Sequence, residues 1–215
     1  MGMQEELSAY GAWRTRVEQT IVRLRGWLFE SNLNDSHNDL CIEQLLQKLR
    51  DDRLVVAFVA EFSRGKSELI NAIFFGDQGA RVLPSSSGRT TMCPTELMYD
   101  GSRPACIDLL PIDTRRGTTT VSDLKSQPGA WKRIELDTTS TAAMQQALGR
   151  VSEQRKVAIG EAEALGFRID LSGENGLQPD SQGMVEVPAW RHAIINLPHP
   201  LLRQGLVILD TPGLN

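Results

Sequence analysis

Residues 54–67 read Leu54-Val55-Val56-Ala57-Phe58-Val59-Ala60-Glu61-Phe62-Ser63-Arg64-Gly65-Lys66-Ser67. Residues 54–60 are apolar without alternation, which is typical of a central strand in a parallel sheet that is covered on both faces. Residues 69–74 read Leu-Ile-Asn-Ala-Ile-Phe and predict a helix directly after this stretch. A buried strand, a loop that ends in Gly-Lys-Ser and a helix together predict an α/β protein with a phosphate-binding loop.

The loop at residues 60–67 suits a triphosphate, because converging backbone N–H groups and a helix N-terminus supply positive dipoles. The Lys66 ammonium would reach the β- and γ-phosphates, and the Ser67 hydroxyl would ligate the Mg²⁺ that bridges them. The usual pattern begins with glycine, whereas this chain has Ala60, and alanine strains a turn that needs positive φ. The residues expected to contact the nucleotide in this loop are Ala60, Glu61, Phe62, Ser63, Arg64, Gly65, Lys66 and Ser67.

Another motif, Asp210-Thr211-Pro212-Gly213, directly follows the apolar residues 206–209. It puts a carboxylate at the end of a predicted strand, where open α/β sheets bind ligands. Asp210 would hold the water shell of the metal, and the Gly213 N–H would meet the γ-phosphate. Such a tetrapeptide alone is more often a plain turn, but together with Lys66 and Ser67 it indicates the other half of one nucleotide site.

These residues resemble the GTPase domain of dynamin-like proteins, particularly the bacterial branch. Three motifs carry the resemblance, in the order of that family: the loop at residues 60–67 running into Glu68-Leu69-Ile70-Asn71-Ala72, then Thr90-Thr91-Met92-Cys93-Pro94-Thr95-Glu96-Leu97, then Asp210-Thr211-Pro212-Gly213-Leu214. The resemblance implies an α/β P-loop NTPase fold, that is, a dynamin-type G domain, preceded by an N-terminal helical hairpin.

The resemblance also implies a domain division. Residues 1–50 would form N-terminal helices of a bundle, and residues 51–215 a partial GTPase domain with a family-specific insertion within about 101–184. The guanine-reading motif Asn/Thr-Lys-x-Asp is absent, because no lysine of the chain has aspartate two residues later. We therefore expect an N-terminal fragment whose phosphate-loop strand lacks a neighbour, and which aggregates and binds GTP weakly by itself.

The site roles that the resemblance implies are the following. Thr91 would close on Mg²⁺ and position the attacking water, and Ser63 would lie near the transferring phosphate. The expected catalytic residues are Lys66, Ser63 and Thr91, and the expected metal ligands are Ser67, Thr91 and Asp210. Arg64 remains open between an arginine finger supplied in cis and a solvated or dimer-contact arginine, since some relatives carry such an arginine one position earlier.

The implied function is GTP binding and Mg²⁺-dependent GTP hydrolysis, coupled in the full-length protein to membrane remodelling or tethering. A homodimer or oligomer through the nucleotide face and a peripheral membrane contact through the bundle belong to the same expectation. Two alternatives stay open. One is a nucleotide-gated binding switch with little turnover, and the other is an ATP-using P-loop protein.

Composition narrows the partners and the compartment. A net charge of −4 provides no basic field for DNA or RNA, so nucleic acid is not expected as a partner. Three widely spaced cysteines indicate neither a disulfide framework nor a metal cluster, which fits a reducing cytoplasm. The N-terminus has no targeting pattern, and the longest apolar run is Leu54 to Ala60. Any membrane contact is therefore expected to be peripheral, at the inner membrane face.

Periodicity predicts the remaining elements. Apolar residues recur at three- and four-residue spacings over residues 4–29, which predicts a long helix whose stripe is core rather than a membrane-binding face. A second helix would be capped by Asn38 or Asp39 and end near Arg50. A strict four-three alternation predicts one further helix over 141–165.

Three other strands and one loop complete the predicted fold. Residues 105–110, 185–196 and 206–209 are typical of strands, and the loop would cover 170–183. His192 and His199 lack any spacing that indicates catalysis or metal binding, so both are interpreted as structural.

Overall fold

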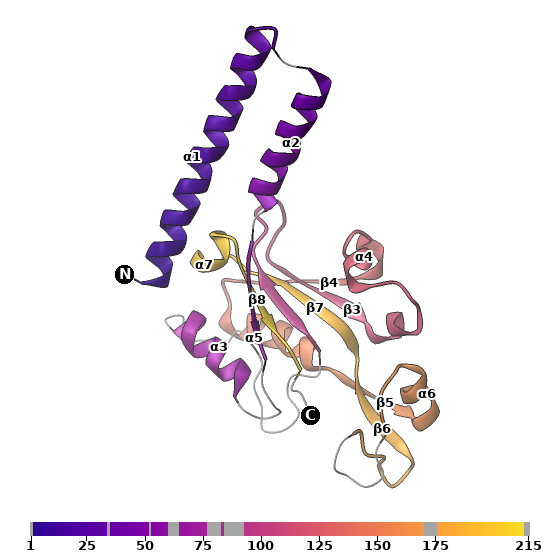
Figure 1. Cartoon of the computed structure of the whole chain (residues 1–215). Coiled ribbons are helices and arrows are strands. Elements are labelled where there is room, and N and C mark those ends of the chain that lie inside the picture. The colour runs from indigo at the N-terminus through magenta and orange to yellow at the C-terminus, as the bar shows by residue number, and fades with distance from the viewer. Residues whose placement is uncertain are drawn as a thin grey trace.

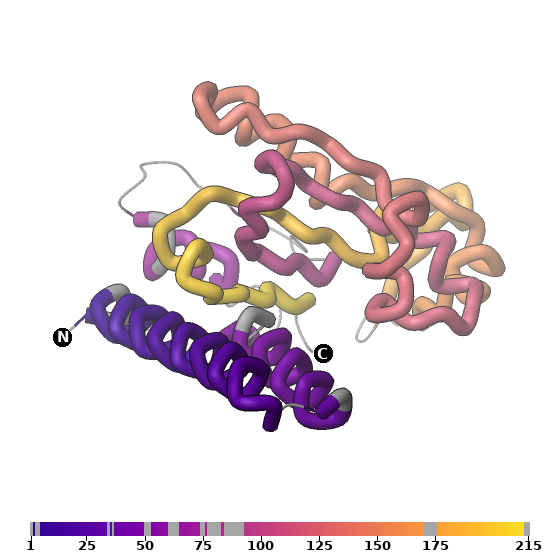
Figure 2. The backbone as a smooth tube through the Cα atoms, turned by 90° about the horizontal axis from the view of Figure 1, so that it is seen from above, coloured from indigo at the N-terminus to yellow at the C-terminus, as the bar shows by residue number. Residues whose placement is uncertain are grey.

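The computed structural model describes residues 2–33, 35–51, 53–59, 65–76, 83, 93–169 and 176–212. Two N-terminal helices, α1 (Met3–Glu30) and α2 (Ser36–Asp51), lie side by side and extend from one end of a mixed α/β body (Figures 1 and 2). This arrangement confirms the predicted fold class and the N-terminal helices. None of the described helices is long and apolar enough to cross a membrane.

The helical hairpin is held by a charged contact as well as by apolar packing. The guanidinium of Arg25 in α1 donates two hydrogen bonds of 2.7 Å to the carboxylate of Asp39 in α2. Ile42 and Leu46 of α2 are buried. The predicted cap of α2 is wrong: the helix begins three residues earlier than Asp39, and Asp35 Oδ1 accepts the Asn38 N–H at 2.7 Å. Asp39 lies inside the helix and pairs with Arg25, and the carboxylate of Asp35, just before the first helical residue, caps the helix.

The main sheet has six strands in the order β1-β8-β2-β7-β3-β4. The pairs β1/β8 and β2/β7 are parallel, and the pairs β2/β8, β3/β7 and β3/β4 are antiparallel. The strands span β1 (Leu54–Phe58), β2 (Thr95–Met98), β3 (Cys106–Pro111), β4 (Lys132–Glu135), β7 (Trp190–Asn196) and β8 (Leu206–Asp210). Each short strand is stabilised by its neighbours rather than by its own length.

The strand β1 lies at an edge of this sheet, so its prediction as a central strand covered on both faces is wrong for the described residues. Leu54 and Val55 are 53% and 59% exposed, although both are apolar. The edge position agrees with the expectation that the phosphate-loop strand lacks a neighbour. An apolar run therefore identified the strand correctly but did not identify its place in the sheet.

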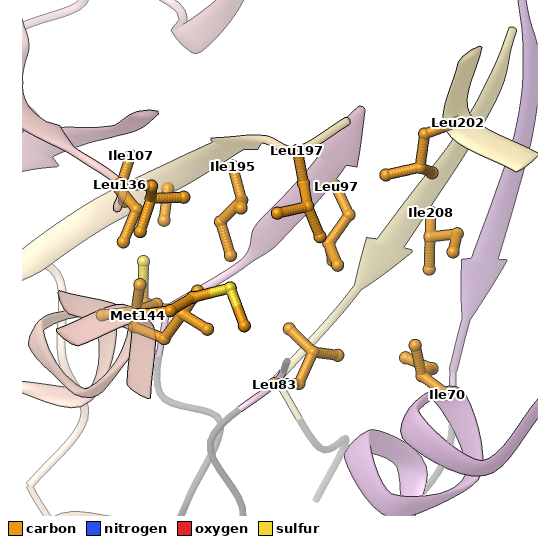
Figure 3. Packing of buried hydrophobic residues seen from close by; sticks show 14 of the residues in the cluster. Ile70, Leu83, Leu97, Ile107, Leu136, Met144, Ile195, Leu197, Leu202 and Ile208 are labelled. Carbon is orange, nitrogen blue, oxygen red and sulfur yellow. The ribbon is translucent and has the colours of Figure 1, made fainter. Parts of the chain in front are cut away.

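Three helices cover one face of the sheet and enclose the main core (Figure 3). They are α3 (Lys66–Phe75), α5 (Thr141–Gly149) and α7 (Pro200–Arg203). Ile70 of α3 packs in the same cluster as Leu83 and the strand residues Leu97 and Ile208, all nearly inaccessible to solvent. On the opposite face, Met98, Ile194 and Val207 pack against Trp131. The short elements η2 (Ile112–Arg116), α4 (Val121–Lys125) and η3 (Pro128–Ala130) lie between β3 and β4 in the chain.

The predicted helix over 141–165 is wrong. Its residues form α5, the turn η4 (Arg150–Ser152), the strand β5 (Gln154–Ala158) and the helix α6 (Ile159–Ala164). The apolar residues of the predicted alternation are divided between two cores: Met144, Leu148 and Val151 join the main core, whereas Ala162 and Leu165 join a second one. Pairing with β6 (Met184–Pro188) overrides the helical spacing, because β5 gains a full antiparallel ladder there.

The predicted strand over 185–196 is two strands. β6 pairs only with β5 in a two-stranded sheet, and β7 lies inside the main sheet. Ala189 separates them and accepts the Ile112 N–H through its carbonyl. Of the predicted loop over 170–183, residues 170–175 lie outside the described part of the chain. In the remainder, the Asp180 carboxylate accepts backbone N–H groups of Gln182 and Met184.

Candidate nucleotide-phosphate site

Gly65 connects the phosphate loop to α3. It caps the N-terminus of the helix with φ 73° and ψ 24°, which is a left-handed conformation. Its carbonyl accepts the Leu69 N–H at 2.8 Å and so starts the helical hydrogen bonds. Glycine reaches this conformation without the steric cost that other residues meet. Lys66 and Ser67 consequently occupy the first turn of α3, where backbone N–H groups have no helical partner and favour an anion.

The Ser67 hydroxyl donates a hydrogen bond of 2.7 Å to Oδ2 of Asp210. Both residues are buried, with exposed fractions of 7% and 2%. This contact joins the first turn of α3 to the carboxyl end of β8, across most of the length of the chain. A hydroxyl and a carboxylate are oxygen ligands of the kind that Mg²⁺ prefers. The donor set at this position therefore fits a magnesium ion.

The strand ends around Asp210 are fastened to one another. Asp210 lies opposite Phe58 in the parallel ladder of β1 and β8, and the Thr211 hydroxyl donates to the Phe58 carbonyl at 2.8 Å. Asp210 also lies opposite Thr95 in the antiparallel ladder of β8 and β2. Because β2 runs in the opposite direction to β8, its first residue meets the last residue of β8. The end of β1, the end of β8 and the start of β2 thus lie at one edge of the sheet.

This edge collects the described portions of all three sequence motifs. Lys66 and Ser67 of the first motif, Thr95 of the second and Asp210 of the third lie there, and Ser67 is in direct contact with Asp210. The other predicted site residues lie outside the described residues, and their roles remain predictions: Ala60, Glu61, Phe62, Ser63, Arg64, Thr91 and Gly213.

Asn71, which lies one helical turn after Ser67, was not predicted as a site residue. Its Oδ1 accepts the Leu83 N–H at 2.8 Å, and its Nδ2 donates to the Leu83 carbonyl at 2.9 Å. Both residues are buried. The residues of α3 that turn inward are spaced at i, i+3 and i+4, so the spacing from Ser67 would have identified the burial of Asn71 but not its partner.

A charged cluster on the other face of the sheet includes Glu96 of the motif at residues 90–97, and this cluster was also not predicted. Lys125 Nζ donates to both oxygens of Glu96 at 2.6 and 2.8 Å, and His192 Nε2 lies 3.4 Å from Glu96 Oε1. Burial opposes the ionisation of Glu96, but the proximity of His192 and the hydrogen bonds and charge of Lys125 lower the pKa of Glu96 to about 2. Glu96 is therefore a carboxylate at neutral pH.

The second predicted structural histidine, His199, lies at the start of α7. Its Nδ1 accepts the Leu201 N–H at 3.3 Å and so caps the helix. Burial lowers the pKa of His199, which favours the neutral ring that can accept this hydrogen bond.

Comparison with known proteins agrees with the three motifs. A sequence model of the dynamin family matches residues 56–215. No curated protein sequence matches the chain. Two solved structures of an oligomerised bacterial dynamin pair, described as providing a mechanism for the long-range sensing and tethering of membranes, are similar to 97% of the chain. The first has 17% sequence identity and a TM-score of 0.45, and the second has 15% and 0.42.

The chain spans 25% and 24% of the lengths of those two solved chains. The family model, in contrast, extends from within β1 through the Asp210 motif to the last residue and includes every described residue of the nucleotide-phosphate site. The chain therefore belongs to the dynamin family.

Proposed function

We propose that this chain is the phosphate-binding part of a dynamin-like GTPase, which binds GTP with Mg²⁺ and hydrolyses it. The observation that carries the proposal is the buried hydrogen bond between Ser67 and Asp210, directly beside Lys66 at the N-terminus of α3. A hydroxyl, a carboxylate, an ammonium and a helix N-terminus in one place match the chemical needs of a magnesium triphosphate.

Each group has a separate task in this proposal. The Lys66 ammonium neutralises charge on the β- and γ-phosphates, and the backbone N–H groups of the first turn of α3 donate to phosphate oxygens. Ser67 and Asp210 hold Mg²⁺, directly or through its water shell. The ion, when bound, neutralises charge that develops on the phosphates. In the same proposal, Thr91 would orient the attacking water, Ser63 would act near the transferred phosphoryl group, and the Gly213 N–H would meet the γ-phosphate.

A measurement of turnover distinguishes a GTP-hydrolysing enzyme from a nucleotide-gated binding switch. In the complete protein, we expect Lys66→Ala to lower single-turnover GTP hydrolysis by about 100-fold or more, because charge stabilisation is the main catalytic term in phosphoryl transfer. Gln127→Ala, a change in an exposed residue of the same chain, serves as the control. If wild type and Lys66→Ala hydrolyse GTP equally slowly while they differ in partner capture, the protein is a nucleotide-gated switch.

Guanine specificity rests on membership of the dynamin family. Competition of unlabelled GTP and ATP against a fluorescent GTP analogue on the complete protein tests it. We expect GTP to displace the analogue at concentrations at least about tenfold below those of ATP, since a base-reading hydrogen bond that is lost leaves buried polar groups unpaired. Equal displacement by ATP supports the ATP-using alternative.

The coupling to membranes and to self-association is part of the same proposal. We infer that the complete protein forms a homodimer or oligomer through its nucleotide face and contacts a membrane peripherally through its helical bundle. Flotation with anionic vesicles, with GTP, GDP or no nucleotide, tests the membrane contact. Nucleotide-dependent flotation is the expected result, and a protein that remains unbound in all three conditions contradicts it.

The two candidate roles of Arg64, an arginine finger in cis and a dimer contact, predict different kinetics. An arginine finger supplied in cis lowers the barrier within one molecule, so Arg64→Ala would lower kcat at every protein concentration. A dimer-contact arginine would instead weaken association, and the loss of activity would be overcome by raising the protein concentration.

A further inference from the structure

We propose that Asn71 is a positioning residue of the hydrolysis reaction. It fixes Leu83 to the phosphate-binding helix and thereby fixes the point at which the chain enters residues 84–92, which contain Thr91. This inference rests on the proposed GTPase function, because Thr91 has a role only in that reaction. No sequence motif or comparison assigns Asn71 such a part.

The contact between Asn71 and Leu83 has the geometry of a backbone pair. The carboxamide of Asn71 accepts the Leu83 N–H at 2.8 Å and donates to the Leu83 carbonyl at 2.9 Å, so both polar groups of one residue are engaged by one side chain. Two residues exchange the same two hydrogen bonds in an antiparallel ladder. The carboxamide thus takes the place of a strand partner for Leu83, which has none among the strands of the described residues.

We call this contact between Asn71 and Leu83 the clamp, and both of its residues are buried. Asn71 is 6% exposed and Leu83 is 2% exposed. The Leu83 side chain packs in the core cluster with Ile70 of α3 and Ile208 of β8, and Figure 3 shows the three side chains close together. Leu83 therefore cannot leave its position without exposing its side chain and breaking both of its hydrogen bonds to Asn71.

The same face of α3 carries both the metal ligand and the clamp. Ser67 and Asn71 are separated by four residues and are both buried, so they lie one above the other on the helix. Ser67 contacts Asp210 in β8, and Asn71 contacts Leu83. The helix α3 thus links the phosphate-binding turn to Leu83, from which the sequence continues to Thr91.

The first described residues after Thr91 are also held in the fold. Cys93 is 4% exposed and belongs to the main core, and Thr95 begins β2 opposite Asp210. A segment whose two ends are fixed has fewer conformations to lose when one of its residues must meet a ligand. Asn71 therefore acts on the step that needs Thr91, and not on the contacts that the phosphate loop alone makes to the nucleotide.

The test compares Asn71→Ala with Asn196→Ala in the complete protein. Asn196 is also a buried asparagine that holds a loop: its Oδ1 accepts the Asp100 N–H, and its Nδ2 donates to carbonyls at residues 100, 103 and 104. Both variants lose buried hydrogen bonds, but only Asn71 is connected to the nucleotide site. The measurements are single-turnover GTP hydrolysis and the dissociation constant of GDP.

We expect Asn71→Ala to lower the hydrolysis rate about 10- to 100-fold, as a misplaced catalytic group does, while the GDP affinity changes less than about twofold. Asn196→Ala should leave both quantities close to wild type. Asn71→Ala with a wild-type rate overturns the inference, and so does a loss of GDP binding equal to the loss of hydrolysis, because that result describes a structural residue.

A second variant keeps the inference testable if Asn71→Ala does not fold. Asn71→Asp retains an acceptor for the Leu83 N–H but loses the donor for the Leu83 carbonyl, and it should give an intermediate rate. Hydrogen exchange at the Leu83 amide should be faster in Asn71→Ala and slowed again in Asn71→Asp. Wild-type exchange rates in Asn71→Ala contradict the clamp.

The outcomes also separate this inference from the proposed function. A wild-type protein that does not hydrolyse GTP refutes the proposed function by itself. Failure of the inference about Asn71, in contrast, is recognised in a protein whose wild type is active, for example as equal hydrolysis rates of Asn71→Ala and Asn196→Ala.

Discussion

At the scale of single residues, Gly65 connects the backbone conformation to the anion site. Its φ of 73° lies in the left-handed region, and a Cβ added there would meet no heavy atom within 4 Å. The effect of a substitution at this position is therefore conformational and not steric. The same residue orients the first turn of α3, which carries Lys66 and Ser67.

Gly65→Ala is expected to lower the free energy of unfolding by about 1 kcal/mol, because a left-handed conformation is unfavourable for alanine. Gly160→Ala is the matched control, since Gly160 lies inside the helix α6 with equally open space around its Cβ position. There alanine should be neutral or stabilising by up to about 1 kcal/mol. Urea unfolding measures both, and a Gly65→Ala chain as stable as wild type would contradict the conformational account.

The ion pair of Lys125 and Glu96 predicts a pH-dependent stability. The pKa of Glu96 is lowered from 4.5 to about 2 in the folded chain, because the opposing effect of burial is outweighed by the nearby His192 and the hydrogen-bonded Lys125. A lowered carboxyl pKa stabilises the fold fully above about pH 4.5, and this contribution is lost as the pH falls towards about 2.

Lys125→Met removes the cation and keeps most of the side-chain volume. We expect it to lower the free energy of unfolding by about 1–2 kcal/mol at pH 7, after allowance for solvent screening, and by progressively less between pH 4.5 and 2. Urea unfolding of both chains across this range checks the prediction. A stability difference that is the same at pH 3 and pH 7 would contradict it.

At the scale of elements, β5, α6 and β6 form a unit with a core of its own. Val157, Ala162, Leu165, Val185 and Val187 of this unit pack with Ile112 and are not part of the main cluster. Its two strands pair only with each other. A unit with a separate core and a separate sheet is expected to unfold locally without the main sheet.

Leu165→Ala and Leu97→Ala compare the two cores with the same substitution, since both leucines are almost fully buried. Each deletion should cost about 2–5 kcal/mol in the unit that it affects. Hydrogen exchange should accelerate in β5 and β6 alone for Leu165→Ala, and in β2, β7 and β8 for Leu97→Ala. If Leu165→Ala accelerates exchange in the main sheet to the same degree, the two cores form one cooperative unit.

Local pattern predicted those elements whose sequence differs most from its surroundings. β1 and β8 are apolar runs beside turn residues, and α1 repeats its apolar residues over its whole length, so these elements were found within a few residues of their ends. β4 reads Lys-Arg-Ile-Glu and is mostly exposed, and only its pairing with β3 makes it a strand. The helix predicted over 141–165 failed for the same reason, because pairing with β6 decided β5.

The candidate site was predictable to the extent that it follows motifs. Lys66, Ser67 and Asp210 were identified from strand-loop-helix and strand-end patterns, and the structure brings Ser67 and Asp210 into contact. The Asn71–Leu83 contact was not predicted, because it joins a helix residue to a residue twelve positions later through tertiary hydrogen bonds. Tertiary hydrogen bonds of this kind follow from the fold and not from local periodicity.

At the scale of the whole molecule, the exposed edge of the main sheet affects solution behaviour. β1 is the terminal strand of the described sheet, with Val55 59% exposed. An apolar edge strand presents unpaired backbone groups to another chain. We therefore expect the 215-residue chain to self-associate.

Val55→Lys should reduce this self-association, because a charged side chain on an edge strand opposes pairing with a second copy. Val22→Lys is the control: Val22 is an exposed residue of α1, so it adds the same charge away from the sheet edge. Static light scattering over a range of concentrations measures both. If Val22→Lys reduces scattering as much as Val55→Lys does, net charge and not the edge governs association.

The central claim is that α3 and β8 together hold the magnesium of a nucleoside triphosphate through Ser67 and Asp210. The most direct measurement is single-turnover GTP hydrolysis by the complete protein over a titration of Mg²⁺, for wild type and for Ser67→Ala. The account predicts that hydrolysis requires Mg²⁺ and that Ser67→Ala raises the Mg²⁺ concentration needed for half-maximal rate by about tenfold or more, as expected when a metal ligand is removed. Identical Mg²⁺ dependence in the two proteins would contradict it.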